Sequence, residues 1–328
     1  MHRYRTYHYV IVGADFHSEG GAWKSIYHFF RHREQSGDRC LLVDLRRGDG
    51  LRQWFAALCF SPRVLVNGMA ALTRWSILIP MLLRRDIAIY LHDTEYVLDA
   101  LKGHHPWRYR LLARLLRSRR VLCVSQQMAD LYQRRFGSLR TIVVYEVTEL
   151  DPRPTLTPGL MHIMMVGTLN RRKGFPLFLK VAELAAARGL PWQFHWVGGL
   201  GEADLGDVPP IVKWWGWRES AASLVEQADL FFLSSVDDPQ PLSCLEALAL
   251  GKRAVVYAGT GSAEFIKRQP GCRVFPEYSP IAAVDALVAA LAEKPDPLAL
   301  LSMLANHGSV ASFSAKLETA WNGTRTDA

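Results

Sequence analysis

The sequence has few cysteines, and their spacing fits neither a disulfide framework nor a metal site. The five cysteines are odd in number and scattered, and none forms a C-x-x-C pair. This pattern disfavours a disulfide-stabilised secreted domain and a structural zinc site. We therefore expect a protein of the reducing cytoplasm.

The sequence also lacks an apolar run long enough to cross a membrane. Its most apolar stretch, SILIPMLL at residues 76–83, contains a proline and lies between arginines, whereas a spanning helix needs about 20 apolar residues. The first residues pass directly from basic side chains into a strand-like run, without the apolar core of a signal peptide. We expect neither export nor a membrane span.

Acidic residues are too few to balance the basic ones. The 39 lysines and arginines outnumber 31 aspartates and glutamates, which gives a formal net charge of +8. Such a charge favours phosphate-bearing partners, whether nucleic acid, anionic lipid or a small ligand. No zinc-finger spacing, RNP-type aromatic run or helix-turn-helix pattern is present, so we expect no nucleic-acid partner.

What the sequence does contain is a regular alternation of β-rich runs and helical patterns, which is typical of parallel sheets with crossover helices. The β-rich runs are residues 9–15, 39–45, 63–68, 87–93, 120–125 and 141–146, then 161–167, 192–199, 211–217, 229–235 and 253–259. Helical patterns such as residues 22–35 and 126–136 are followed by Gly37 and Gly137, which suit a C-terminal cap. The proline-rich segment DPRPTLTPG after residue 150 predicts a linker between two domains.

One glycine-containing turn follows the first strand of each half. Parallel sheets bind ligands at such turns, beyond the carboxyl ends of their strands. Gly20 and Gly21 precede the first helix and would let a phosphate approach the backbone, although a plain tight turn fits equally well. In the second half, Arg171, Arg172 and Lys173 precede a helix. A diphosphate would meet charge and helix dipole together there, whereas a solvated basic loop is the simpler alternative.

A third segment, DDPQPLSCLEALALG, places carboxylates on both sides of a helix start. Asp238 lies in the turn after a buried strand, and Glu246 lies in the first or second turn of the helix. A carboxylate at the second position can accept two hydrogen bonds from a vicinal diol such as ribose. The alternative is a capping box, because Ser243 and Glu246 have the S-x-x-E spacing.

Taken in order, EGGA, LHD, VGTLNRRKG, VGGLG, WWGW, DPQPLSCLE, ALGKRAVV and TGSAEFI resemble the motifs of the retaining glycosyltransferases of family 4 over nearly the whole chain. The resemblance implies the GT-B fold, an α/β architecture of two Rossmann-like doubly wound domains facing across a cleft. It assigns residues 1–150 to an acceptor-binding domain, 151–160 to a linker, 161–311 to a nucleotide-sugar-binding domain and 312–328 to a helix that returns to the first domain.

The resemblance also implies an activity. It suggests a retaining hexosyltransferase that moves a sugar from a nucleoside diphosphate-sugar donor to a glycan or lipid-linked acceptor in bacterial polysaccharide, lipopolysaccharide or glycolipid biosynthesis. The donor would be a co-substrate, and no metal or other cofactor is expected. Cationic side chains would stabilise the leaving diphosphate instead.

Specific roles follow for the residues that match the family motifs. The resemblance places Glu246 on the donor ribose, Lys173 on the diphosphate, and His92 and Asp238 near the donor sugar. Asp238 departs from the family glutamate by one methylene. Thr168 stands where the family has an arginine, so Arg171 or Arg172 would supply the second phosphate contact. Contacts to the sugar, phosphate or base are implied for Gln240, Leu242, Ser243, Trp217 and Arg218.

Residues 104–120 combine leucines at helical spacing with arginines on another face. That pattern fits a helix lying on an anionic membrane, or a helix that buries its leucines against the sheet while its arginines face outward. Two other functions stay open: a sugar-nucleotide epimerase on the same fold, and a non-catalytic scaffold that binds nucleotide or a partner. The departures at Asp238 and Thr168 motivate the scaffold hypothesis.

Overall fold

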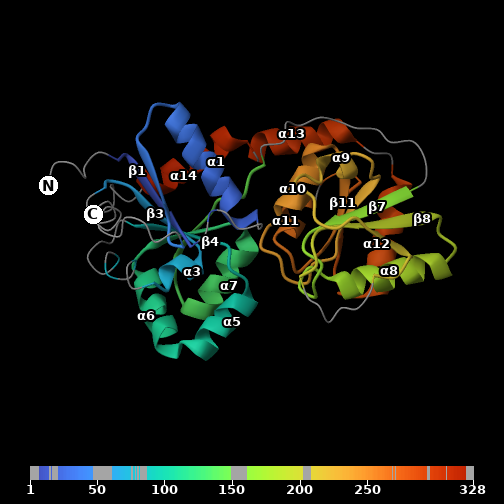
Figure 1. The fold of residues 1–328 in the computed structure, drawn as a ribbon, viewed down its shortest axis with the longest axis horizontal. Coiled ribbons are helices and arrows are strands. Elements are labelled where there is room, and N and C mark those ends of the chain that lie inside the picture. The colour runs from blue at the N-terminus through green and yellow to red at the C-terminus, as the bar shows by residue number, and fades with distance from the viewer. Residues whose placement is uncertain are drawn as a thin grey trace. The chain divides into compact units, whose positions relative to one another are not determined.

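The computed structural model describes residues 7–14, 16, 21–46, 61–74, 77, 79, 81, 87–148, 161–201, 208–267, 269, 271–293, 296–307 and 309–322. The chain divides into two compact units, one comprising Met1–Val147 with Ser309–Ala328 and the other comprising Thr148–Gly308. Each unit is built on a six-stranded sheet (Figure 1). The proline-rich segment predicted as a linker, 151–160, lies outside the described residues.

The first unit is a doubly wound parallel sheet with strand order β2-β1-β3-β4-β5-β6. Its strands are β1 (Tyr9–Gly13), β2 (Cys40–Asp44), β3 (Val64–Asn67), β4 (Ala88–Leu91), β5 (Arg120–Cys123) and β6 (Arg140–Val143). Its helices are the 3-10 turn η2 (Gly21–Trp23), α1 (Lys24–Gln35), α3 (Met69–Leu72), α5 (Glu95–His104), α6 (Pro106–Arg117), α7 (Gln126–Phe136) and α14 (Val310–Asn322). Helices α1 and α14 lie on one face, and α5, α6 and α7 lie on the other (Figure 1).

The strands of this sheet form because their residues are apolar on both sides. Every residue of β1, β3 and β4 is buried, as expected for a parallel sheet that helices cover on both faces. Helix α7 begins where the Ser125 hydroxyl accepts a hydrogen bond from the backbone N–H of Met128, and it ends at Gly137, which has φ +83°. The helix predicted at residues 126–136 is thus confirmed.

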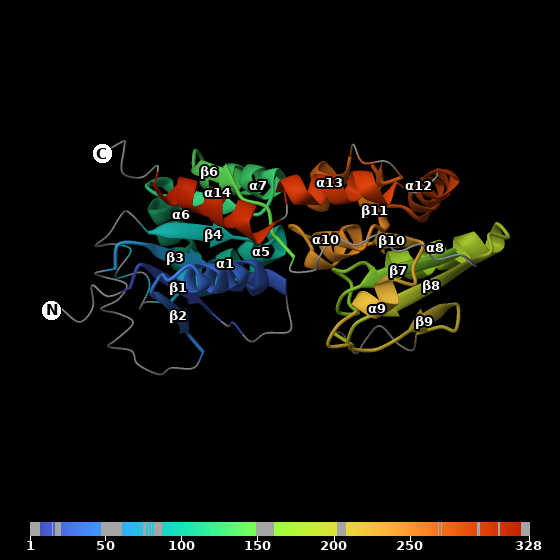
Figure 2. The ribbon, with the colours of Figure 1, turned by 90° about the horizontal axis from the view of Figure 1, so that it is seen from above.

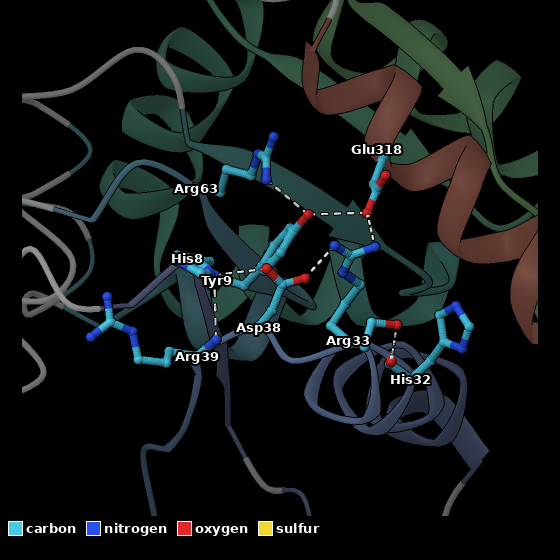
Figure 3. Close-up of polar contacts among 9 residues, drawn as sticks. His8, Tyr9, His32, Arg33, Asp38, Arg39, Arg63 and Glu318 are labelled. Carbon is cyan, nitrogen blue, oxygen red and sulfur yellow. Dashed lines mark hydrogen bonds and ion pairs between the residues drawn. The ribbon is translucent and has the colours of Figure 1, made fainter.

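The C-terminal helix α14 joins the first unit through both apolar and polar contacts. It packs on α1, and a polar network connects Glu318 to the start of β1 (Figure 3). The Glu318 Oε1 atom accepts hydrogen bonds from the Tyr9 hydroxyl at 3.0 Å and from Arg33 at 2.6 Å. Arg33 also pairs with Asp38, and Arg63 donates to the Tyr9 oxygen at 2.8 Å. Burial, then the Glu318 hydrogen bond, raises the pKa of Tyr9 to about 12, so the phenol stays neutral.

The second unit repeats the architecture with strand order β12-β11-β10-β7-β8-β9, all parallel. Its strands are β7 (Met161–Val166), β8 (Trp192–Val197), β9 (Val212–Trp214), β10 (Leu230–Leu233), β11 (Arg253–Tyr257) and β12 (Arg273–Phe275). Its helices are α8 (Phe175–Ala187), α9 (Ala222–Val225), α10 (Leu242–Ala249), α11 (Ser262–Ile266), α12 (Pro280–Ala292) and α13 (Pro297–His307). Helices α8 and α12 pack together on one face, and α10 packs with α9 and α13 on the other (Figure 1). The order of the strands from β9 through β8, β7 and β10 to β11 can be followed in Figure 2.

An aromatic cluster forms the centre of the second core. The ring of Phe178 on α8 meets Phe194 and Trp196 of β8 edge-on, at centroid distances of 5.5 and 5.1 Å, and stacks on Phe232 of β10 at 5.7 Å. Edge-on and offset arrangements are the favourable ones for aromatic pairs. These contacts fix α8 against the sheet and so fix the turn in front of the helix.

The strand order of the second sheet contains a switch point. From β7 the chain moves outward through β8 and β9, and then returns to place β10 on the other side of β7. The connections that leave β7 and β10 therefore diverge from neighbouring strand ends, the usual position of a ligand site in an open α/β sheet. These two connections are the residues between β7 and α8 and those between β10 and α10. They contain half of the site residues that the sequence predicts in the second half, and α10, which follows the second connection, contains three more.

Candidate functional site

The two connections at the switch point are joined by backbone contacts. The N–H of Val236 donates to the carbonyl oxygen of Arg172 at 3.0 Å, and the Arg172 guanidinium donates to the carbonyl oxygen of Asp237 at 3.0 Å. Arg172 is thereby tied to the β10–α10 connection, whereas the neighbouring Arg171 is exposed. The basic turn and the acidic turn form one structure.

At the centre of this structure Lys173 and Asp238 form an ion pair. The Lys173 Nζ atom lies 2.6 Å from Asp238 Oδ2, with 15% of the lysine side chain and 6% of the aspartate side chain exposed. The hydroxyl of Ser235 donates to the same carboxylate oxygen at 3.1 Å. A pair this shielded from water depends on such additional hydrogen bonds, because both charges have lost hydration.

Gly174 makes the turn after Lys173 possible. It has φ +79°, and a Cβ atom built on it would lie 1.8 Å from the carbonyl oxygen of Ser234. That oxygen accepts a hydrogen bond from the Tyr278 hydroxyl at 2.8 Å, and the Ser234 hydroxyl donates to the carbonyl oxygen of Lys173 at 3.0 Å. Burial raises the pKa of Tyr278 above its usual value, so its hydroxyl remains a donor. Only glycine fits between β10 and the lysine-bearing turn.

The loop after β7 brings the lysine stem close to the sheet. A Cβ atom on Gly167 would lie 3.3 Å from the Lys173 side chain, so the lysine methylenes pass directly over this glycine. The Gly167 carbonyl oxygen accepts a hydrogen bond from the Trp196 indole at 2.9 Å. Thr168, the departure from the family arginine, lies with its methyl group against Gly201. The basic groups of this loop therefore come from residues 171–173.

The N-terminus of helix α10 is not a capping box. Its N-cap is Pro241, no side chain caps it, and Ser243 is already its second residue. Proline at this point loses no hydrogen bond, because the first N–H groups of a helix have no partner within it. The capping-box interpretation of Ser243 with Glu246 is therefore wrong. Glu246 lies half-buried in the second helical turn, while Leu242 and Gln240 are buried.

Trp217 and Arg218 follow β9 at the same edge of the sheet. Trp217 is 55% exposed, and a Cβ atom on Gly199, just beyond β8, would lie 3.6 Å from its Cβ. The exposed Arg218 donates to the Trp217 carbonyl oxygen at 3.0 Å. The predicted site residues of the second half thus all follow the carboxyl ends of strands in one sheet.

The predicted site residues of the first half lie in the other unit. His92 follows β4 and is half-buried; a Cβ atom on Gly68 would lie 3.2 Å from its Nε2 atom, which has no hydrogen-bond partner among the described residues. Next to it, the Asp93 carboxylate accepts a hydrogen bond at 2.7 Å from the N–H of Met69, the first residue of α3. Gly21 opens η2 in front of α1. Gly20 lies outside the described residues.

Sequence reasoning did not find Ser235 or the Tyr278–Ser234 contact. Ser234 and Ser235 end a predicted buried strand, so two hydroxyls at a strand end were a usable signal. Tyr278 offered none, because it lies 44 residues from Ser234 in the sequence.

A second polar cluster lies within the sheet, at β7, β8 and the end of β9. The His195 Nε2 atom is 2.9 Å from His162 Nδ1, and the Trp215 indole donates to His195 Nδ1 at 3.3 Å. An indole N–H can only donate, so His195 carries its proton on Nε2 and donates it to His162. Burial, then the electrostatic effects of the neighbouring His162 and Lys213, lower the pKa of His195 from 6.5 to about 4. His195 is therefore neutral at pH 7.

Helix α6 buries its leucines and exposes its arginines. Leu112, Leu115 and Leu116 belong to the core of the first unit, whereas Arg110 and Arg114 face outward. Trp107, at the start of α6, is 48% exposed. No helix within the described ranges has the length and apolar composition that crossing a membrane requires. In the same part of the chain, no three His, Cys, Asp or Glu side chains gather as metal ligands would.

The second unit also matches a known family at the sequence level. Residues 161–293 match the model of the family described as glycosyl transferases group 1. This range contains Lys173, Asp238, Glu246 and the contacts between the two connections. No curated protein sequence matches the chain significantly.

Solved structures resemble the chain over almost its whole length. The Anabaena protein HepE in complex with UDP and glucose has a TM-score of 0.72 at 15% identity, with 95% of this chain and 99% of that chain covered. Sucrose-phosphate synthase from Thermosynechococcus elongatus has a TM-score of 0.71 at 14% identity, covering 98% and 100%. The lipopolysaccharide outer core galactosyltransferase WaaB in its apo form has a TM-score of 0.71 at 16% identity, covering 96% and 99%.

These findings establish the fold of the protein. At such identities the structural likeness establishes the fold, which is the two-domain α/β fold of GT-B glycosyltransferases. Together with the family match over the second unit, it supports a GT-B glycosyltransferase.

Proposed function

We propose that the protein is a metal-independent, retaining glycosyltransferase of family 4 that transfers a hexose from a nucleoside diphosphate-sugar to a glycan or glycolipid acceptor. The observation that carries the proposal is the joined pair of connections at the switch point of the second sheet. They hold Lys173 beside Asp238 and place Glu246 on the helix that follows. All three lie inside the range that matches glycosyl transferases group 1.

In this proposal the second unit binds the donor. Lys173 binds the diphosphate, and Arg171, whose side chain is exposed, supplies the second phosphate contact. Glu246 accepts hydrogen bonds from the ribose hydroxyls, and the exposed ring of Trp217 contacts the base together with Arg218. Backbone groups of Gln240, Leu242 and Ser243 contact the sugar or its phosphate. The presence of UDP and glucose in the HepE complex supports a UDP-sugar as donor.

The reaction requires no side-chain nucleophile. The bond between the anomeric carbon and the phosphate oxygen breaks, the acceptor hydroxyl oxygen bonds to the same face of that carbon, and the acceptor proton passes to the departing phosphate oxygen. Lys173 and Arg171 stabilise the charge that develops on the diphosphate, which is the part that a divalent metal plays elsewhere. Amide groups at the N-terminus of α1, next to Gly20 and Gly21, supply further donors, and His92 contacts the sugar. The first unit binds the acceptor.

Nucleotide binding tests the donor assignment. Thermal unfolding is followed with UDP, GDP, ADP, CMP and dTDP in EDTA; a ligand at a hundred times its dissociation constant stabilises by about 2.7 kcal/mol. We expect UDP to stabilise the wild type and Glu246→Ala to lose this effect. Glu183→Ala, an exposed glutamate on α8, is the matched control and keeps it. A folded wild type that none of the nucleotides stabilises would favour the scaffold hypothesis.

Product analysis separates the transferase from the epimerase hypothesis. The protein is incubated with UDP-glucose and a candidate acceptor, and NMR gives the anomeric configuration of the product. We expect a retained configuration, and no release of sugar when the acceptor is left out. An epimerase would release free or epimerised sugar without an acceptor. Inversion at the anomeric carbon would exclude the retaining mechanism.

We further propose that the protein works at the cytoplasmic face of a bacterial membrane, in polysaccharide, lipopolysaccharide or glycolipid assembly. Because the α6 leucines are in the core, contact with an anionic surface through residues 104–120 would use Trp107 and the exposed arginines. Co-sedimentation with phosphatidylglycerol vesicles is expected to weaken in the double variant Arg110→Gln/Arg114→Gln. The control Lys180→Gln, on α8, leaves it unchanged. Equal sedimentation with neutral vesicles would argue against the proposal.

A further inference from the structure

We propose that Asp238 acts as the counter-ion of Lys173, positioning its ammonium group and restraining its affinity for the diphosphate, and is not a direct ligand of the donor sugar. The inference rests on the proposed function, because it assigns Lys173 to the diphosphate. It departs from what the family resemblance implies, which places the matching carboxylate near the sugar hydroxyls.

The first support is how firmly Asp238 is held. One carboxylate oxygen, Oδ2, receives both the Lys173 ammonium at 2.6 Å and the Ser235 hydroxyl at 3.1 Å. Its backbone oxygen accepts a hydrogen bond from the N–H of Gly261 at 2.9 Å. With 6% of its side chain exposed and Ser235 fully buried, Asp238 has little room to turn toward another ligand.

The second support is the length of the side chain. A glutamate at this position would extend one methylene farther from the backbone and could pass the ammonium. The aspartate ends at the ammonium itself. The shorter side chain that departs from the family pattern is therefore the one that suits an ion pair with Lys173.

The chemistry of the pair explains what it would do. A lysine ammonium has three N–H donors, and one of them is given to Asp238. This bond orients the other two away from the carboxylate, while the negative charge offsets the attraction of Lys173 for phosphate. A diphosphate would then bind firmly enough to be stabilised as it leaves the sugar, but weakly enough to dissociate afterwards.

The test is a double-mutant cycle measured by calorimetric titration with UDP, UDP-glucose and uridine. Asp238→Asn removes the charge and keeps the shape. By Coulomb's law at an effective dielectric constant of ~20, the interaction of a unit charge with a phosphate about 6 Å away corresponds to roughly a hundredfold in affinity, so losing the carboxylate charge tightens UDP binding by up to about that factor. We expect the dissociation constant of UDP to fall by up to that factor and that of uridine to stay the same. In a Lys173→Met background the change should be several-fold smaller, because only the direct repulsion between the carboxylate and the phosphate is left.

Three results would overturn the inference. The first is an unchanged dissociation constant for UDP with weakened binding of UDP-glucose, which is the signature of a sugar ligand. The second is weaker binding of UDP, and the third is a change in UDP binding that is equally large with and without Lys173. Should Asp238→Asn unfold, Asp238→Ser, smaller and also neutral, takes its place with the same expectation. If the wild type binds none of UDP, GDP, ADP or dTDP, the proposed function fails and the inference falls with it. In the three results above the wild type still binds nucleotide, so they overturn the inference alone.

Discussion

Replacing Gly174 by alanine tests how the lysine-bearing turn is built. The glycine has φ +79°, a left-handed conformation that costs an L-residue about 1–2 kcal/mol. The new methyl group would also lie 1.8 Å from the Ser234 carbonyl oxygen and 2.7 Å from the Tyr278 hydroxyl. Moving that carbonyl adds an overpacking cost of about 1–3 kcal/mol and disturbs hydrogen bonds worth about 1 kcal/mol each. The expected total is about 3–7 kcal/mol.

Gly189 provides the matched control, because it has φ +67° and no atom within 4 Å of the position that a Cβ would take. Gly189→Ala therefore shows the conformational cost alone, about 1–2 kcal/mol. A difference of about 2–5 kcal/mol between the variants corresponds to a Tm difference of roughly 4–20 °C for a unit of this size. Differential scanning calorimetry measures both, and the same samples show whether UDP still stabilises Gly174→Ala; we expect that it does not.

The outcome that refutes this reasoning is equal destabilisation by the two substitutions. The Ser234 carbonyl would then move away at no cost, and the contact between β10 and the lysine-bearing turn would not be what holds Lys173 in place. A normal UDP response in Gly174→Ala would lead to the same conclusion for ligand binding.

Three further predictions concern the two cores. Ser25→Ala removes a buried hydroxyl that donates to Glu146 at 2.8 Å and accepts from the N–H of Val147 at 2.9 Å. The two partners lose these hydrogen bonds, so the free energy of unfolding measured in urea should fall by about 1–3 kcal/mol. A loss below 0.5 kcal/mol would contradict this prediction. Glu318→Gln breaks the ion pair with Arg33 and should lower stability by about 1 kcal/mol, whereas the exposed Thr319→Ala should change little. The pKa of His195 is about 4 in the folded protein and 6.5 in the unfolded chain. Between pH 4 and pH 6.5 the unfolded chain therefore binds more protons than the folded protein. Stability should therefore fall by up to about 3 kcal/mol as the pH drops from 6.5 to 4, and a His195→Gln variant with an unchanged pH slope would exclude this group as the cause.

Much of the site could be located from the sequence because its parts are marked locally. Lys173 and Gly174 stand in the turn after a strand-like run, and Glu246 lies in the first or second turn of a helical pattern that follows another. The start of α10 was harder to place, since Pro241 and Ser243 are both plausible near a helix N-terminus. The chain begins the helix after Pro241, which excludes the capping box that the spacing of Ser243 and Glu246 suggested.

The sequence by itself determined the alternation of strands and helices, and with it the parallel doubly wound class, because hydrophobic periodicity and glycine caps act over a few residues. The tertiary structure alone decided that Asp238 meets Lys173, 65 residues away, and that Tyr278 supports Ser234. These contacts depend on β10 pairing with β7 after the chain has passed through β8 and β9. No local pattern encodes that strand order, since it follows from how whole elements bury their apolar faces together.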